Sequence, residues 1–147
     1  MKFDLIIPVY NNKRGLYRSL MSIGVESNSI VDVTVVDDCS TENYDDIVNF
    51  FAQFIPIRIL KLDVNSGPGM ARQYGLDHTK NDYIIFLDCG DYFLGPDTLT
   101  NIHNIVKENS VINLFSWSYL DSIGNDCTCD TNRLHGKVYK REFLTHH

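Results

Sequence analysis

The sequence predicts an α/β fold with a mostly parallel central sheet and helices on both faces. One observation on the sequence and one rule of sheet topology lead to this fold class. Short apolar runs that suit buried strands alternate with longer segments whose apolar residues recur at helical spacing. Parallel neighbours in a sheet need a crossover connection, usually a helix, and this alternation supplies one. The 147 residues contain no repeat or linker, so we expect a single domain over residues 1–147.

The first part of the chain contains two strand–helix units. A strand over residues 3–9 precedes a helix over about 13–26, and a strand over 31–36 precedes a helix that begins near Tyr44. Ser40 is a good capping residue before the second helix. The side chains expected to face the core from these two helices are Leu16, Leu20, Ile23, Ile47, Phe50, Phe51 and Phe54.

Two further units follow. An alternating strand over residues 57–62 leads into a glycine- and proline-rich turn over 66–69, which opens a helix that ends near His78. An apolar strand over 83–87 leads to a helix that begins near Pro96, because proline suits the first turn of a helix. The apolar residues of this last helix are Leu99, Ile102, Ile105 and Val106.

The end of the chain is expected to be less regular. A strand runs from Val111 to about Tyr119, and a polar loop covers residues 120–133. A short strand over 137–139 and a helix that starts at Lys140 complete the predicted elements.

Polar clusters follow four of the predicted strands at their carboxyl ends: residues 8–11, 37–38, 63–67 and 88–91. In open parallel sheets, ligands bind in the crevice beyond the carboxyl ends of the strands. We therefore expect the four clusters to converge on one edge of the sheet and to form one binding site.

The cluster that contains Asp88 and Asp91 is the most informative. Burying a lone carboxylate costs several kcal/mol, so two acids at the end of a buried strand need a partner. Mg²⁺ is usually held by one or two carboxylates together with substrate phosphates, and Gly90 allows a ligand to approach closely. A turn with solvated acids would explain this tetrapeptide alone. The other clusters at the same edge favour a cation that neutralises a diphosphate.

Two other motifs have both a structural and a functional interpretation. Asp37 and Asp38 suit a turn before a helix N-terminus, but a carboxylate here could also accept hydrogen bonds from a nucleotide base or ribose. The segment 67–72 lacks the third glycine of a dinucleotide-binding fingerprint, and it follows the third strand rather than the first. The segment could have only the structural role of starting a helix. Alternatively, it could place Arg72 so that its side chain faces a phosphate-bearing cleft.

Composition argues against several classes of protein. The net charge of −6 disfavours a broad nucleic-acid surface, which needs clustered Lys and Arg. No apolar run approaches the roughly 18 residues of a membrane span, and Asp4 comes too early for a signal peptide. We therefore expect a cytoplasmic protein with no transmembrane segment. We expect its four cysteines to be reduced thiols without a metal role.

Four motifs together resemble family 2 glycosyltransferases, which have the Rossmann-like GT-A fold: LIIPVYNN, VTVVDDCSTEN, NSGPGMARQYGL and YIIFLDCGDYF. They occur in the order and spacing of that family over roughly residues 3–95. A looser match over residues 134–144, LHGKVYKREFL, resembles a later acceptor-side segment of some bacterial and phage members. The resemblance implies a metal-dependent inverting transferase with a nucleotide-sugar donor, for which we expect a UDP-sugar.

The resemblance also implies roles for particular residues. The positions that match the family's nucleotide-sugar contacts are Pro8, Tyr10, Asp37, Asp38, Asn65, Gly67, Arg72 and Asp88. Among them, Pro8, Tyr10 and Asp38 match residues that hold the uracil or ribose. Asp91 matches the ligand of Mn²⁺ or Mg²⁺ at the diphosphate. Because Gly90 replaces the usual acid of the DxD-type motif, Asp91 is expected to be the main metal ligand.

The catalytic base is left unassigned by the resemblance. In the family a carboxylate well beyond the equivalent of Lys137 deprotonates the acceptor hydroxyl, and none of the late acids here matches that motif. The chain therefore resembles a GT-A domain that lacks the usual C-terminal part, either as a truncated piece or as a naturally compact member.

Two alternatives and several details stay open at this point. A nucleotide-sugar-binding remnant without transfer activity would explain the missing base. A nucleotidyltransferase would need a glycine-rich loop after the first strand, and PVYNNKRG contains little glycine. The sugar and the acceptor are unknown, although a glycan, polymer or protein acceptor is favoured over nucleic acid. A homo-oligomer is possible.

Overall fold

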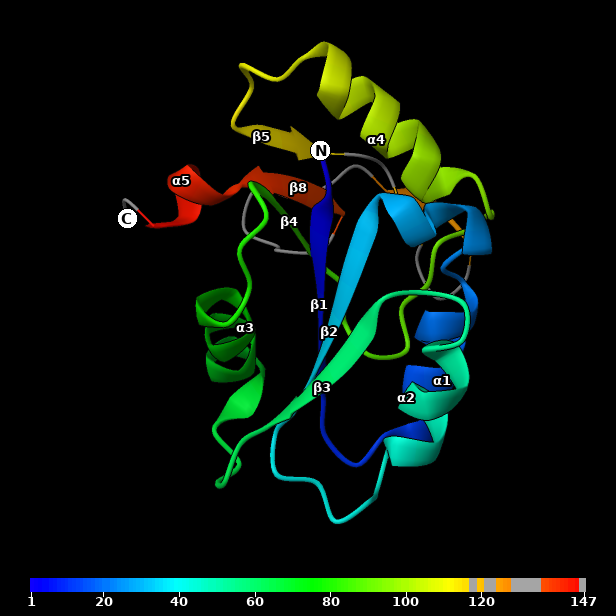
Figure 1. Cartoon of the computed structure of the whole chain (residues 1–147), viewed down its shortest axis with the longest axis vertical. Coiled ribbons are helices and arrows are strands. Elements are labelled where there is room, and N and C mark those ends of the chain that lie inside the picture. Colours follow the sequence, from blue (N-terminus) through cyan, green and yellow to red (C-terminus); the bar gives the residue numbers. More distant parts are fainter. Residues whose placement is uncertain (117–118, 121–123, 128–135, 146–147) are drawn as a thin grey trace.

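The computed structural model describes residues 1–116, 119–120, 124–127 and 136–145 (Figure 1). Within these residues, six strands form one sheet in the order β3-β2-β1-β4-β8-β5. Their bounds are β1 Phe3–Val9, β2 Val31–Asp37, β3 Ile57–Lys61, β4 Tyr83–Phe86, β5 Leu114–Ser116 and β8 Lys137–Lys140. A separate ribbon pairs β6 (Tyr119–Leu120) with β7 (Asp126–Cys127).

The sheet is parallel over its first four strands and antiparallel at one end. β1 is parallel to both β2 and β4, and β2 is parallel to β3. β8 lies antiparallel to β4 on one side and to β5 on the other. The prediction of a mostly parallel sheet is therefore confirmed, and the carboxyl ends of β1 to β4 all lie at one edge.

Helices cover both faces of the sheet (Figure 1). Their bounds are α1 Lys13–Met21, the 3-10 helix η1 Val25–Ser29, α2 Asp45–Phe51, α3 Gly67–Asp77, α4 Thr98–Glu108 and α5 Arg141–Thr145. Side chains of α1, α2 and α4 belong to one apolar cluster, and those of α3 and α5 belong to the other. The expected helices on both faces are thus confirmed.

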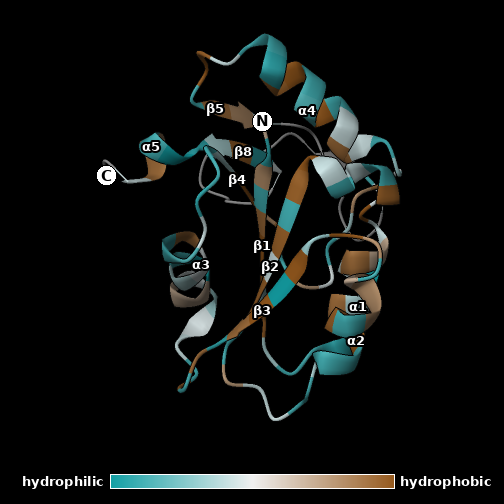
Figure 2. Ribbon diagram, viewed as in Figure 1, coloured by the Kyte–Doolittle hydropathy of each residue, from teal (hydrophilic) through white to brown (hydrophobic). Residues whose placement is uncertain are grey.

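Successive side chains of each strand point to opposite faces of the sheet, and this alternation separates the two apolar clusters. In β1, Leu5 and Ile7 pack toward α1, α2 and α4, whereas Ile6 packs toward α3. Figure 2 shows the central strands mostly hydrophobic, whereas the helices carry both hydrophobic and hydrophilic residues. On the α3 face, a Cβ built on Gly75 would lie 2.6 Å from Cγ2 of Ile6, so this glycine lets the helix pack directly on the sheet.

Some element predictions were wrong in extent or in facing. The first helix ends at Met21 instead of near Glu26, because Gly24 has an extended backbone and separates it from η1. Phe50 and Phe54 were expected in the core but are 46% and 45% exposed. The buried stripe of α2 is formed by Ile47, Val48 and Phe51, and this stripe leaves Phe50 and Phe54 on the outer side.

Other predicted elements in the second half of the chain also differ from the structure. Ile105 is 55% exposed, because the core-facing stripe of α4 is Leu99, Ile102 and Val106. The strand expected over residues 111–119 is only Leu114–Ser116 in the central sheet, while part of the predicted loop over 120–133 forms the β6–β7 ribbon. Gly124 and Asn125 of that loop have no regular secondary structure, and its other residues lie outside the described part of the chain. The predicted strand over 137–139 and the helix after it are confirmed as β8 and α5.

An ion pair fastens the end of the described chain to β1. The carboxylate of Asp4 is 3% exposed and accepts hydrogen bonds from Nη2 of Arg141 at 2.9 Å and from the backbone N–H of Asn81 at 2.7 Å. Arg141 also donates to the carbonyls of Asn81 and Leu76. No helix among the described residues is both long enough and apolar enough to cross a membrane.

Candidate functional site

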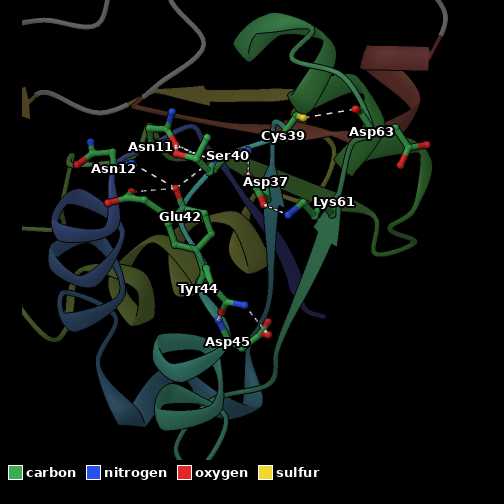
Figure 3. Close-up of polar contacts among 12 residues, drawn as sticks. Asn11, Asn12, Asp37, Cys39, Ser40, Glu42, Tyr44, Asp45, Lys61 and Asp63 are labelled. Atoms are coloured by element: carbon green, nitrogen blue, oxygen red, sulfur yellow. Dashed lines mark hydrogen bonds and ion pairs between the residues drawn. The ribbon is translucent and has the colours of Figure 1, made fainter.

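The loops that follow β1, β2, β3 and β4 meet at the carboxyl edge of the sheet. The backbone N–H of Asn11, after β1, donates to Oγ of Ser40, after β2, at 2.9 Å. The thiol of Cys39 donates to the carbonyl of Asp63, after β3, at 3.3 Å (Figure 3). The thiol of Cys89, after β4, donates to the carbonyl of Asn12 at 3.4 Å. The convergence expected from the sequence is thus present.

A buried hydroxyl network fixes the first two loops relative to each other. Tyr44 is 1% exposed, and its hydroxyl donates to Oγ of Ser40 at 2.9 Å and accepts from the backbone N–H of Asn12 at 3.2 Å (Figure 3). Oδ1 of Asn11 accepts from the backbone N–H of Thr41 at 2.9 Å. Burial raises the pKa of the Tyr44 phenol, so this group stays a neutral donor.

Sequence reasoning missed these positioning residues. Asn11 has φ of +45°, a left-handed backbone that Asn tolerates better than most residues. An asparagine after a strand is a weak signal for such a turn. Nothing in the local sequence indicates that Tyr44 reaches back to the loop after β1, because the two segments are about thirty residues apart.

Asp37 stabilises the loop after β2 from inside. Its side chain is 2% exposed, and Oδ1 accepts from the backbone N–H of Ser40 at 2.8 Å. Oδ2 lies 3.5 Å from Nζ of Lys61 at the end of β3 (Figure 3). Asp37 therefore orients the loop that carries Asp38.

Asp38 joins the end of β2 to the start of α3. Its carboxylate is 3% exposed, and its two oxygens accept from the backbone N–H groups of Ser66 and Gly67 at 2.7 and 2.8 Å. A carboxylate at a helix N-terminus is favoured by the helix dipole. Each oxygen can accept a second hydrogen bond, so the capping role leaves acceptor capacity for a ligand.

The first turn of α3 faces open space. A Cβ built on Gly67 or Gly69 would meet no atom within 4 Å, and Gly67 has φ of +85°, which disfavours other residues. Asn65 precedes this turn and is exposed. The helix N-terminus offers a partial positive charge and the backbone N–H of Gly69 to an anion, because the N–H of Gly67 already donates to Asp38 and Pro68 has none.

Arg72, on the next turn of α3, forms an ion pair with Asp88 after β4. Nη2 of Arg72 contacts Oδ1 of Asp88, and the two side chains are 16% and 41% exposed. Within the described residues, Nε of Arg72 is buried without a hydrogen-bond partner, and Oδ2 of Asp88 receives no hydrogen bond. The pair thus keeps donor and acceptor capacity at the edge of the site.

Ser19 of α1 fixes the turn over residues 88–91. Its hydroxyl, 0% exposed, accepts from the backbone N–H of Gly90 at 2.9 Å and donates to the carbonyl of Asp91 at 2.7 Å. Gly90 has φ of +103°, which explains why glycine stands there. The turn closes with a bond from the N–H of Asp91 to the carbonyl of Asp88 at 2.9 Å. Sequence reasoning missed Ser19, whose only signal is a hydroxyl on the apolar face of a helix.

The fixed turn suits a divalent cation that brings further ligands with it. Asp91 is exposed at the end of the turn, and both Asp88 and Asp91 are hard oxygen donors. Among the described residues, no three His, Cys, Asp or Glu side chains are grouped to hold a metal by themselves. Mg²⁺ and Mn²⁺ fit a site with few protein carboxylates when phosphate oxygens complete the shell.

The remaining predicted site residues lie at the same edge. Pro8 is buried near the end of β1, and Tyr10 follows the strand with its side chain 50% exposed. Burial, followed by the charges of Asp88 and Asp91, raises the pKa of the Cys89 thiol to about 12. Cys39 and Cys89 form no disulfide with another described residue. Cys129 lies outside the described residues.

Comparisons with known proteins identify the family of the chain. The family model of glycosyl transferase family 2 matches residues 4–138. The chain is 30% identical over 112 residues to the poly(ribitol-phosphate) β-N-acetylglucosaminyltransferase TarS of Staphylococcus aureus, a match that covers 74% of this chain and 19% of that protein.

Solved structures share the fold. Residues 1–349 of S. aureus TarS in complex with UDP give a TM-score of 0.85 at 24% identity, covering 99% of this chain and 48% of that one. The mannosyltransferase PcManGT of Pyrobaculum calidifontis, in complex with GDP-mannose and Mn²⁺, gives a TM-score of 0.77 at 19% identity, covering 99% and 46%. The chain thus spans less than half the length of these proteins, and its fold is that of GT-A glycosyltransferases. With the family model matched over most of its residues, the chain belongs to glycosyl transferase family 2.

Proposed function

We propose that this chain binds the nucleotide-sugar donor of a metal-dependent, inverting glycosyltransferase, and that the donor is a UDP-sugar. The proposal rests on one arrangement. Asp38 caps the start of α3, and the ion pair between Arg72 and Asp88 joins this helix to the turn over residues 88–91. This arrangement places a backbone donor, a guanidinium and two carboxylates beside one another. A nucleoside diphosphate with a bound cation needs groups of these kinds.

The nucleoside end is assigned to the loops after β1, β2 and β3. Tyr10 offers a half-exposed aromatic ring. Pro8 is buried near the end of β1 and stiffens the backbone that leads to Tyr10. Asp38 accepts from the base or ribose through the lone pairs that α3 does not use. Asn65 is the exposed amide of the neighbouring loop. Asp37 contributes by holding this loop in place.

The diphosphate end is assigned to α3 and the turn after β4. The open first turn of α3 offers the backbone N–H of Gly69 to phosphate oxygens, because the N–H of Gly67 already donates to Asp38 and Pro68 has none. Arg72 adds a cation. Asp88 faces the ribose side, and Asp91 is the main ligand of Mn²⁺ or Mg²⁺. The bound cation would stabilise the negative charge that develops on the leaving nucleoside diphosphate. The Mn²⁺ in the structure of the mannosyltransferase supports this choice of ion.

The acceptor is proposed to be a hydroxyl-bearing polymer. The relative TarS is named for transfer to poly(ribitol-phosphate), which favours a polymer over nucleic acid. In an inverting reaction the acceptor oxygen forms a bond to the anomeric carbon as the bond to the diphosphate breaks, and the hydroxyl proton passes to a base. No described residue is assigned as that base.

The test is to incubate the full chain with UDP-sugars and Mn²⁺, with and without an acceptor polymer, and to measure released UDP. Turnover of one UDP-sugar, even slow hydrolysis to water, supports the transferase. Asp82, exposed at the opposite end of β4, supplies a matched control, because Asp82→Ala removes the same group outside the site. Recovery of all donors intact, together with UDP binding, would instead favour the binding remnant.

A further inference from the structure

An open groove of about 640 Å³ lies between α1 and the turn that contains Gly90. Four exposed side chains of α1 line it, namely Arg14, Tyr17, Arg18 and Met21. They are spaced three and four residues apart and therefore share one face of the helix. The groove shares Gly90 with the proposed metal turn, so a molecule bound in it would lie next to the donor site.

Among the described residues, the two arginines of the groove have no carboxylate partner. Within the described residues, the ion pairs involve other cations, and neither Arg14 nor Arg18 is among them. Like charges four residues apart on a helix are slightly destabilising, so the pair brings the helix no benefit of its own. In a chain with a net charge of −6, this is a local cationic surface beside the site.

Arg18 is held in place without losing its donors. Its guanidinium carbon lies 4.0 Å from the centroid of the Tyr92 ring, a cation–π contact. A guanidinium held over an aromatic ring keeps N–H groups at its rim available to an anion. Tyr92 directly follows Asp91, and the stacking therefore fixes Arg18 relative to the proposed metal turn.

The same helix also holds the turn from its buried side. Ser19 bonds to Gly90 and Asp91, while Arg18 and Tyr17 lie exposed beside the groove. One rigid element therefore sets the position of the groove relative to the reacting centre. Tyr17 and Met21 add apolar surface between and beyond the charges, which suits the carbon segments of a chain that carries anions at intervals.

We propose that this groove binds the acceptor, and that the acceptor is a linear polymer whose anionic groups are phosphodiesters. The inference rests on the proposed function and adds the chemical class of the second substrate. Guanidinium groups bind phosphate oxygens through paired N–H donors, and two of them one helical turn apart can engage neighbouring phosphodiesters of one chain. The polymer then runs past Gly90 with a hydroxyl beside the donor sugar.

The test uses a fluorescent hexamer of glycerol phosphate as the probe and the full chain without donor, with binding followed by fluorescence anisotropy. We expect R14Q/R18Q to weaken binding at least about tenfold. The slope of log K against log salt should become shallower by roughly 1.4, as for two lost phosphate contacts on a flexible strand. R14K/R18K should retain part of the affinity, because it keeps the charge but not the paired donors.

Matched controls separate this groove from general charge effects and from the donor site. K80Q/K107Q removes two positive charges from exposed positions elsewhere and should leave binding unchanged. UDP should stabilise R14Q/R18Q as it does the unaltered chain, which shows that the variant folds. Equal binding of R14Q/R18Q, or equal binding of neutral maltohexaose, would overturn the groove assignment. Equal binding of a galacturonate hexamer would overturn the phosphodiester class. Probe binding by a chain that UDP does not stabilise would overturn both the acceptor role and the proposed function.

Discussion

Asp38 accepts hydrogen bonds from the backbone N–H groups of both Ser66 and Gly67, so one buried carboxylate joins the end of β2 to the start of α3. The strand and the helix thereby meet at a fixed point beneath the proposed nucleotide. Because this carboxylate serves both the fold and the site, its removal should affect stability and binding together.

Asp38→Asn should lower the free energy of unfolding by about 1–3 kcal/mol, since the amide loses the charge at the helix N-terminus and cannot accept both bonds through oxygen. Urea unfolding measures this loss. Asp45→Asn is the control, because Asp45 is an exposed acid in the first turn of α2 and its loss should cost under about 0.5 kcal/mol. Equal losses in the two variants would mean that the bonds to α3 contribute nothing specific.

Ser19→Ala should loosen the turn over residues 88–91. The change leaves the N–H of Gly90 and the carbonyl of Asp91 without their buried partner, at a cost of about 1–3 kcal/mol. It should also reduce the part of UDP binding that depends on Mn²⁺, measured by calorimetric titration with and without the ion. Ser29→Ala, at an exposed position of η1, should change neither quantity. Unchanged Mn²⁺ dependence in Ser19→Ala would separate the turn from the metal.

Asp4 and Arg141 should show strong coupling in unfolding experiments. Removing one member of a buried pair leaves an uncompensated charge, which costs about 3–5 kcal/mol, whereas removing both costs less than the sum. Asp4→Asn, Arg141→Met and the double variant, unfolded in urea, provide the coupling energy. Lys2 and Asp32, more than a third exposed, form the control pair and should couple by less than about 1 kcal/mol. Additive effects at Asp4 and Arg141 would contradict the prediction.

Cys89 should react slowly with thiol reagents. Its pKa is raised to about 12 by burial and then by Asp88 and Asp91, so at pH 8 only about one thiol in ten thousand is ionised. The folded state holds this proton more tightly than the unfolded chain. Stability should therefore be unaffected below about pH 8.5 and should fall as pH rises toward 12.

Iodoacetamide labelling at pH 8, followed by mass spectrometry of the peptide that contains Cys89, measures the first effect. Urea titrations of the unaltered chain and of Cys89→Ala at rising pH measure the second. The substituted chain should lose less stability than the unaltered chain as pH rises. Rapid labelling of Cys89 in the folded protein would show that the thiol is not protected by burial and the neighbouring acids.

The sheet and the location of the site were predictable from the sequence for a simple physical reason. Apolar strands buried on both faces are continuous in sequence, and polar residues at their ends must lie at a sheet edge. The polar clusters after β1 to β4 were therefore found without any knowledge of contacts. Phe50 and Phe54 were wrongly predicted to face the core. A short helix rich in aromatic residues offers more than one apolar stripe, and only tertiary packing selects the one that is buried.

The positioning contacts of the site could not be predicted in the same way. Ser19 and Gly90 are 71 residues apart, and the hydroxyl network of Tyr44 with Asn12 joins segments 32 residues apart. Such pairs depend on how helices are placed on the sheet, which local patterns do not encode. The antiparallel insertion of β8 between β4 and β5 is another long-range choice of this kind.

We infer that the carboxyl edge of the sheet binds a nucleoside diphosphate through a cation on Asp91. The most direct test is thermal unfolding with UDP, GDP and dTDP, each with and without Mn²⁺, for the unaltered chain, Asp91→Ala and Asp82→Ala. UDP at about a hundred times its Kd should add roughly 2.7 kcal/mol, a rise of several degrees, in the presence of Mn²⁺. The rise should persist in Asp82→Ala and disappear in Asp91→Ala. No rise with any nucleotide, or an equal rise in Asp91→Ala, would contradict the claim.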